Sequence, residues 1–256
     1  MKLKEVIKKI ENEFPIALAA KWDFPGLQYG KNKFEVKKIM ICLDLTTAVL
    51  NDAISNKIDL IISHHPFLFN EKIKKIKLKY KNKIIEQLQK HQIAIYGLHT
   101  QYDSSKKGMN SKILDDLKCE DVKSYRNINF IKYGKLPEEI NFDDLIVKLK
   151  TIFNIPYVQF LNWDNEQKIK KIAICAGAGG DLINKIKSDE IDVFITGEMK
   201  WNDWILSYEN KNSVIVLNHF MENYFTNDMD IILKKIFLKD DISIKKHDIK
   251  SPIIYK

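Results

Sequence analysis

Short apolar runs alternate with amphipathic stretches along the first part of the chain. Three runs, at residues 37–46, 58–63 and 93–98, are rich in Ile and Leu and are typical of buried strands. The stretches between them predict helices through residues 51–56 and around residues 84–91. The order strand, helix, strand, helix, strand predicts a parallel sheet with right-handed crossovers.

The second part of the chain repeats this pattern. It has apolar runs at residues 170–176, 191–196 and 213–218, and the stretches at 181–188 and 201–210 between them predict helices. The sequence therefore predicts an α/β fold made of two similar α/β halves, each with a mostly parallel sheet.

A different pattern separates the two repeats. Residues 128–161 predict a strand, a helix and a second strand, and Pro137 with the acidic residues after it marks the start of the helix. We therefore expect a first half over residues 1–128. The second half is expected over residues 129–256, with a small insertion near 129–165.

Composition places the chain among globular proteins of the cytoplasm. It has 256 residues, of which 45% are hydrophobic and 30% charged. No apolar run reaches the roughly 18 residues of a membrane span, and residues 1–14 predict an amphipathic helix rather than a signal peptide. The three cysteines are odd in number and widely separated, which favours reduced core residues. We expect a cytoplasmic protein with no membrane partner.

The net charge of +8 comes almost entirely from lysine, because Arg126 is the only arginine. Sequence-specific recognition of nucleic acid relies on the bidentate guanidinium group, so no specific nucleic-acid binding is expected. The densest basic stretch, at residues 73–83, alternates lysine with apolar residues. It predicts a solvated helix or strand face, with a patch for anionic substrates as the alternative.

Candidate chemistry gathers where the predicted strands end. In open parallel sheets, ligands bind at the carboxyl ends of the strands, where side chains leave the sheet and meet. Four of the six histidines and two carboxylates lie within a few residues of such an end. They are His64, His65, His99, Asp103, His219 and Glu222.

The adjacent histidines favour a metal site with more than one ion. At a strand exit stiffened by Pro66, the rings of His64 and His65 can turn toward two neighbouring ions. Imidazole and carboxylate ligands together suit Zn, Mn or Fe better than Ca or Mg. Five side chains, leaving His99 aside, exceed what one tetrahedral ion needs. Two ions about 3.5–4 Å apart, bridged by a carboxylate, would accommodate them.

Each of these residues also has an ordinary structural interpretation. An adjacent histidine pair is common in loops and hydrogen-bonded cores, and a carboxylate such as Glu222 is favoured at a helix start by the macrodipole. His99 is interpreted as structural, with support of a metal ligand as the alternative. His91 and His247 are expected to lie outside the chemistry. The joint placement of the residues at strand ends favours the metal site.

Two further motifs follow strands of the second part. Gly177, Gly179 and Gly180 lie between a predicted strand and a helix, where they would form a tight turn or bind a phosphate at the helix start. The turn is favoured because the full G-x-G-x-x-G spacing is absent. Glu198 follows the next strand and is a candidate proton acceptor, an outer partner of a ligand, or a helix cap.

The motifs together resemble the Nif-three-like family, whose members are named GTP cyclohydrolase I type 2 homologs. The resemblance covers nearly the whole chain and is carried by HHP at 64–66, HTQYD at 99–103, CAGAGGD at 175–181, TGEMKW at 196–201 and NHFMEN at 218–223. It implies a dinuclear metal site in a cleft between two α/β halves. It also implies a ring-shaped homo-oligomer, expected to be a homohexamer.

The family's ligand pattern falls on His64, His65, Asp103, His219 and Glu222. The chain departs from the family pattern at two positions. Relatives carry the last acid four residues after the histidine, whereas here Glu222 is three residues after His219 and Asn223 holds the fourth position. Relatives also carry a histidine where this chain has Asn202.

Two functions remain open at this stage. The first is a metal-dependent hydrolase of a small phosphorylated or nucleotide-like molecule, of which the ring opening of GTP is one version. The second is a non-catalytic metal-binding scaffold or regulatory protein. No residue in the sequence marks a general acid, so the catalytic residues are left unassigned.

Overall fold

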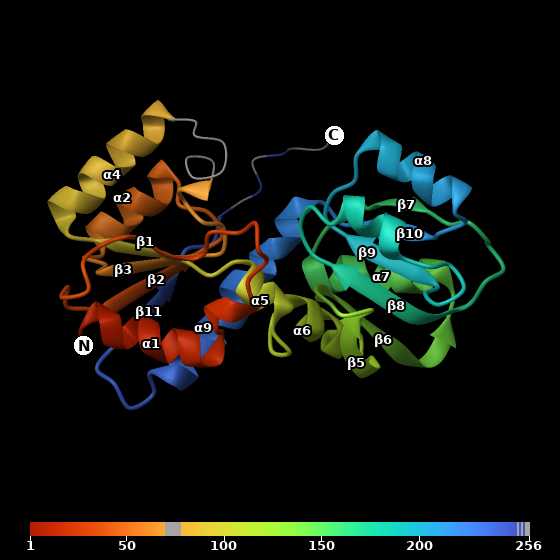
Figure 1. Cartoon of the computed structure of the whole chain (residues 1–256), viewed down its shortest axis with the longest axis horizontal. Helices are drawn as coiled ribbons and strands as arrows, with labels where there is room; N and C mark the ends of the chain where they lie inside the picture. Colours follow the sequence, from red (N-terminus) through yellow and green to blue (C-terminus); the bar gives the residue numbers. More distant parts are fainter. Residues whose placement is uncertain (70–77, 250, 252, 254–256) are drawn as a thin grey trace. The chain divides into compact units, whose positions relative to one another are not determined.

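The computed structural model describes residues 1–69, 78–249, 251 and 253. The chain forms two compact units. The first unit is Met1–Tyr102 with Phe225–Lys256, and the second is Asp103–Tyr224. Figure 1 shows a sheet flanked by helices in each of them. In the part of the chain that is described, no helix is long and apolar enough to cross a membrane.

The first unit is built on a five-stranded sheet of order β1-β4-β3-β2-β11. Neighbouring strands are parallel except for β1, which pairs antiparallel with β4. The three predicted parallel strands are confirmed as neighbours in this sheet. The strands are β1 (Gly26–Tyr29), β2 (Lys38–Cys42), β3 (Leu60–Ser63), β4 (Ala94–Gly97) and β11 (Ser243–Lys246).

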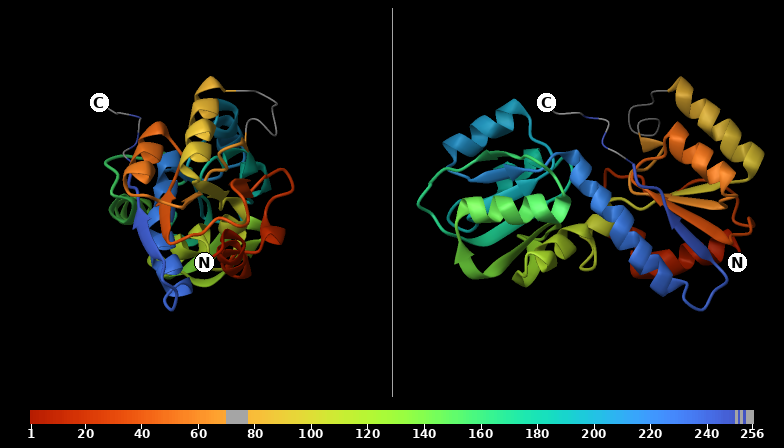
Figure 2. Two further views of the ribbon diagram at one scale, coloured as in Figure 1. Left: turned by 90° about the vertical axis from the view of Figure 1, so that its left-hand side faces the viewer. Right: turned by 180° about the vertical axis from the view of Figure 1, so that it is seen from behind.

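Helices cover both faces of this sheet. The helices α2 (Thr47–Ser55) and α4 (Lys79–His91) lie on one face, and α1 (Leu3–Glu13) and α9 (Tyr224–Ile236) lie on the other (Figures 1 and 2). Side chains alternate between the faces of a strand, so both faces are apolar. Met40 and Cys42 pack toward α2 and α4, whereas the buried Ile41 between them faces the opposite side of the sheet.

The second unit has a six-stranded sheet of order β5-β6-β8-β9-β10-β7. The predicted strands β8, β9 and β10 are parallel neighbours, and the remaining pairs are antiparallel. The strands are β5 (Glu120–Tyr125), β6 (Ile128–Ile140), β7 (Gln159–Leu161), β8 (Ile169–Cys175), β9 (Val193–Thr196) and β10 (Val214–Val216).

Four shorter helices and α7 surround this second sheet. Side chains from η2 and α8 pack on one face, α7 covers the other face, and α6 packs against β5, β6 and β8 (Figure 2). The segment predicted as a helix at residues 181–188 is a 3₁₀ helix. The helices are α6 (Met109–Asp116), α7 (Phe142–Phe153), η2 (Gly180–Lys185), α8 (Trp201–Glu209) and η3 (His219–Asn223).

The compact units differ from the halves expected from the sequence. The first unit ends at Tyr102 rather than near residue 128, because α6 and β5 pack against strands of the second sheet. The chain returns to the first unit at Phe225, and β11 pairs with β2 there. Residues 129–165 contribute β6, which pairs with β8, and β7, which pairs with β10. Part of the lysine-rich stretch at residues 73–83 lies outside the described residues.

Candidate metal centre

The end of β3 places His64 and His65 side by side at the carboxyl edge of the first sheet. Their backbone N–H groups donate to the carbonyl oxygens of Cys42 and Leu43, both at 3.1 Å. The Ser63 hydroxyl donates to the carbonyl of His65 at 2.8 Å. The two rings lie 5.1 Å apart, centroid to centroid, and are tilted by 48°. The chain therefore leaves the sheet with both imidazoles held near one another.

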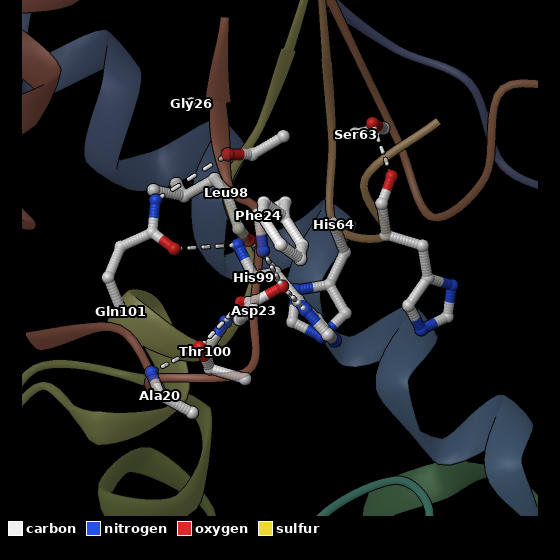
Figure 3. A network of polar contacts seen from close by, with 12 residues as sticks. Ala20, Asp23, Phe24, Gly26, Ser63, His64, Leu98, His99, Thr100 and Gln101 are labelled. Carbon is white, nitrogen blue, oxygen red and sulfur yellow. Dashed lines mark hydrogen bonds and ion pairs between the residues drawn. The ribbon is translucent and has the colours of Figure 1, made fainter. Parts of the chain in front are cut away.

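His64 is buried, and its ring orientation is fixed by a backbone group. Its Nδ1 donates to the carbonyl oxygen of Leu98 at 3.0 Å (Figure 3). The ring also packs against Phe225, at a centroid distance of 5.0 Å. A carbonyl oxygen only accepts hydrogen bonds, so the proton of the neutral ring is on Nδ1. The lone pair is then on Nε2, which is the atom that binds a metal.

His65 has the same arrangement with a carboxylate as its partner. Its Nδ1 donates to Asp44 Oδ1 at 2.8 Å. Asp44 follows the end of β2, the strand next to β3. A carboxylate behind an imidazole fixes the tautomer and makes Nε2 a stronger donor to a metal ion.

His99 follows β4 and is backed by a fully buried carboxylate. Its Nδ1 lies 2.9 Å from Asp23 Oδ1, an ion-pair contact, and the side chain of Asp23 is 0% exposed. The hydroxyl of Thr100 donates to Asp23 Oδ2 at 2.5 Å (Figure 3). Burial acts to raise the pKa of Asp23, but the close contact with His99 and the hydrogen bonds from Thr100 and the Phe24 N–H outweigh it and hold that pKa below its ordinary value.

The three imidazoles of the first unit form one group of ligand atoms. One ligand atom from each of His64, His65 and His99 lies within 4.8 Å of the other two. Two nitrogens bound to one ion at about 2.0–2.1 Å would be roughly 3–3.5 Å apart. Small side-chain movements would therefore let His99 share an ion with His64 or with His65. The sequence predicted His64 and His65 as ligands here, and it did not predict His99 as one.

In the second unit, His219 lies between two carboxylates. Its Nδ1 contacts Glu198 Oε1 and its Nε2 contacts Glu222 Oε2, both at 2.8 Å. Two ligand atoms at right angles around an ion at about 2.0–2.1 Å would be about 2.9 Å apart. The His219–Glu222 spacing therefore matches two neighbouring positions on one ion. Glu198 takes the place of the outer partner, as Asp44 does for His65.

The glycine-rich turn after β8 makes room for Glu222. Gly177 has a φ of +69°, and a Cβ built on it would lie 2.2 Å from Glu222 Oε1. Its carbonyl accepts hydrogen bonds from the N–H groups of Gly197 and Glu198, at 2.9 and 3.0 Å. The turn therefore ties the ends of β8 and β9 together and cradles the Glu222 carboxylate.

Asp103 lies in α5 (Thr100–Ser104) and is buried. Burial raises the pKa of the Cys175 thiol, and the charges of Asp103 and Glu222 raise it further. Both carboxylates are therefore close enough to Cys175 to act on it electrostatically. The structure thus brings two of the predicted acidic ligands near the same side chain of the second unit.

The donor set fits the metal that the family resemblance implies. Imidazole nitrogens with carboxylate oxygens suit Zn, Mn or Fe. The Nδ1 atoms of His64, His65 and His219 each bond an oxygen, and that of His99 lies 2.9 Å from one, which is the usual support of a metal-bound imidazole. These oxygens belong to the Leu98 carbonyl, Asp44, Asp23 and Glu198.

Sequence reasoning missed two of these carboxylates. Asp44 follows β2 at the same sheet edge, so the strand-end rule that found the histidines applies to it as well. Asp23 lies in the loop before β1, and no local pattern marks it. The side-chain amide of Asn202 donates to Oδ1 of its neighbour Asp203 at 3.0 Å. His247 pairs with Asp52 at 2.7 Å and belongs to neither ligand group among the described residues.

The chain matches the family described as Duf34/NIF3 (NGG1p interacting factor 3) over residues 1–252. The GTP cyclohydrolase 1 type 2 homolog of Mycoplasmopsis pulmonis is 30% identical, with 90% of this chain and 92% of that protein covered. The NGG1-interacting factor 3 of Saccharomyces cerevisiae is 28% identical, with 85% and 84% covered.

Solved structures show the same fold. The crystal structure of the Staphylococcus aureus hypothetical protein SA1388 matches with a TM-score of 0.91 at 24% identity, over 100% of this chain and 99% of that one. A Bacillus cereus protein related to NIF3 matches with a TM-score of 0.88 at 19% identity, over 100% and 99%. With the family match over nearly the full length, these findings establish that the chain belongs to the DUF34/NIF3 family.

Proposed function

We propose that this protein is a metal-dependent hydrolase of a small phosphorylated or nucleotide-like molecule. In this proposal it holds two divalent ions, Zn, Mn or Fe, with His64, His65, Asp103, His219 and Glu222. The first two are imidazoles of the first unit, and the other three belong to the second unit.

One observation carries the proposal. His64 and His65 each donate the Nδ1 proton to an oxygen, so the lone pair of each ring is on Nε2. Histidines that only fill a core need no shared tautomer. A metal centre does need one, because the ligand atom of each imidazole must be unprotonated and pointed at the ion.

The chain's own residues would divide the work of the centre between them. Asp44 and Glu198 would hold the imidazoles of His65 and His219 in place. Glu222 and Asp103 would supply negative charge to offset that of the ions. When bound, the ions would lower the pKa of a water molecule and polarise the bond under attack.

The names of the relatives support a nucleotide as the first substrate to test. The Mycoplasmopsis pulmonis relative is named a GTP cyclohydrolase 1 type 2 homolog. Turnover of GTP should therefore be measured with Mn, Zn or Fe present. The expected result is hydrolysis by the wild type and by the His91→Ala control, and none by His64→Ala. Equal turnover by all three proteins would contradict the proposal.

A second function is favoured by the name of another relative. The yeast protein is named for its interaction with NGG1, which fits a regulatory or scaffolding role. In that case the protein would bind metal but turn over none of a panel of nucleotides and phosphate esters. The ring-shaped homohexamer implied by the resemblance stays an expectation, and light scattering of the purified protein would test it.

A further inference from the structure

We infer that His99 is a further ligand of the metal centre and that Asp23 is the residue that positions it. This inference rests on the metal binding proposed above and adds a residue pair that the family's ligand pattern does not include. The pair joins a strand end of the first sheet to the loop before β1.

The first support is the geometry of the ring. His99 takes part in one group of ligand atoms with His64 and His65, all within 4.8 Å of one another. Its ring centroid lies 5.2 Å from that of His64 and 5.6 Å from that of His65. Figure 3 shows the rings of His64 and His99 next to one another, with Asp23 beside His99. Its Nδ1 lies 2.9 Å from Asp23 Oδ1, which leaves Nε2 as the ligand atom of the ring.

The second support is the environment of Asp23. A carboxylate is costly to bury unless its oxygens are hydrogen-bonded. Here Oδ1 accepts from the Phe24 N–H at 2.7 Å and lies 2.9 Å from His99 Nδ1. The other oxygen, Oδ2, accepts from the hydroxyl and the N–H of Thr100, at 2.5 and 3.2 Å. These bonds fix both oxygens, so the carboxylate holds the imidazole plane in one orientation.

The third support is the packing around the ring. The side chain of His99 is 15% exposed. Trp22 and Phe69 lie edge-to-face with it, at centroid distances of 6.0 and 6.2 Å. A ring held by a carboxylate on one side and by aromatic side chains on others has little freedom to turn. The ring would therefore lose little conformational entropy when a metal ion binds, because the fold already holds it in place.

His247 provides the comparison that separates a ligand from a structural histidine. Its Nδ1 bonds a carboxylate, Asp52 Oδ2, at 2.7 Å, and its side chain is 20% exposed. Among the described residues, no group of candidate ligand atoms includes it. The two histidines are thus alike in exposure and in having a carboxylate near Nδ1, and they differ in the burial of that carboxylate and in their distance from other candidate ligands.

The chemical consequence is a centre richer in nitrogen than the family's ligand pattern gives. With His99, the first unit offers three neutral imidazoles. Imidazole-rich sites favour Zn, Fe or Co over Mg, which prefers oxygen ligands. The inference therefore favours borderline divalent ions over Mg for the proposed centre.

The test compares the two pairs in the full-length protein. His99→Asn keeps a donor for Asp23 but removes the Nε2 ligand, and Asp23→Asn removes the orienting charge. His247→Asn and Asp52→Asn are the matched controls. Affinities for Zn and Co would be measured by competition with a chromophoric chelator, and the visible absorption of bound Co(II) would report the ligands.

We expect Asp23→Asn to lower the affinity for one ion about 10–100-fold, and His99→Asn to lower it at least as much. His99→Asn should also change the Co(II) spectrum, which a purely structural role would not do. Both controls should match the wild type. Circular dichroism of the metal-free proteins checks folding, and His99→Gln serves as a second variant if His99→Asn does not fold.

A folded His99 variant with wild-type affinity and a wild-type Co(II) spectrum would overturn the inference while leaving the proposed centre intact. A wild type that binds neither Zn nor Co would instead contradict the proposed metal binding itself. The two failures are distinguished because the first requires a metal-loaded wild type.

Discussion

The two units offer a metal ion opposite kinds of ligand. The first unit presents three imidazoles at the ends of β3 and β4, and the carboxylates near them, Asp44 and Asp23, contact Nδ1 atoms. The second unit presents one imidazole, His219, whose Nε2 lies 2.8 Å from the carboxylate of Glu222. The first group is therefore neutral at its ligand atoms, whereas the second carries negative charge.

The imidazole group of the first unit would therefore leave the charge of two divalent ions uncompensated, and the carboxylate of Glu222 alone would not balance it. Neutral imidazole nitrogens bind a metal ion and fix its coordination geometry, but they do not offset its positive charge. Two dications about 4 Å apart repel one another strongly where the effective dielectric constant is low. Carboxylate ligands must supply the compensation, and among the proposed ligands Asp103 and Glu222 are the carboxylates.

The largest effect is expected when the charge of Glu222 is removed. Glu222→Gln should lose at least one ion, because the amide keeps the shape of the side chain but not its charge. Asn223→Ala should keep both ions, although it changes the position where relatives carry the acid. Metal titration of both variants is the measurement. Full occupancy of Glu222→Gln would show that another group compensates the charge.

The imidazoles of the first unit should act separately. His64→Ala and His65→Ala should each lose about one equivalent of metal and keep their fold, because the two rings are assigned to different ions. Elemental analysis gives the stoichiometry, and circular dichroism gives the fold. If either metal-free variant is unfolded while the metal-free wild type is folded, the pair is a structural feature.

A smaller effect is expected from the carboxylates that support the imidazoles. Asp44→Asn and Glu198→Gln should each lower metal affinity about 10–100-fold without removing an ion at saturating metal. The change in Asp44 tests the first unit and the change in Glu198 tests the second. Competition with a chelator measures both affinities. Wild-type affinity in both variants would mean that these hydrogen bonds do not tune the ligands.

The smallest effect concerns the turn that cradles Glu222. Gly177→Ala places a Cβ 2.2 Å from Glu222 Oε1 at a φ of +69°. It should destabilise the second unit by about 1–2 kcal/mol, because a left-handed backbone is unfavourable for alanine. It should also weaken metal binding as Glu222 is pushed aside. Gly108, at a φ of −90°, is the control position, and denaturant unfolding with metal titration compares them. Equal behaviour of the two alanine variants would contradict this role of the turn.

Much of the fold was predictable because strand exits and apolar runs are local signals. The strands around Ile62 and Phe194 are buried on both faces, which gives continuous apolar runs in the sequence. The unit boundary was not predictable in this way. It depends on pairing between distant segments, as when residues near Ile244 return to lie beside β2.

The candidate site shows the same limit. His64 and His219 stand directly after strands, so their position along the chain marks them. Asp23 contacts His99 from a loop that lies 76 residues earlier in the sequence. Only the tertiary structure brings this pair together. The contact changes the interpretation of His99, which the sequence analysis took as structural.

The metal content of the purified protein decides whether the chain holds the proposed centre. The protein would be purified without chelators, supplied with Zn, Mn or Fe, and freed of loosely bound metal before elemental analysis. The proposed centre predicts up to two tightly bound transition-metal ions per chain, and fewer in Glu222→Gln. A wild-type protein that retains no ion under these conditions would contradict the proposed metal centre.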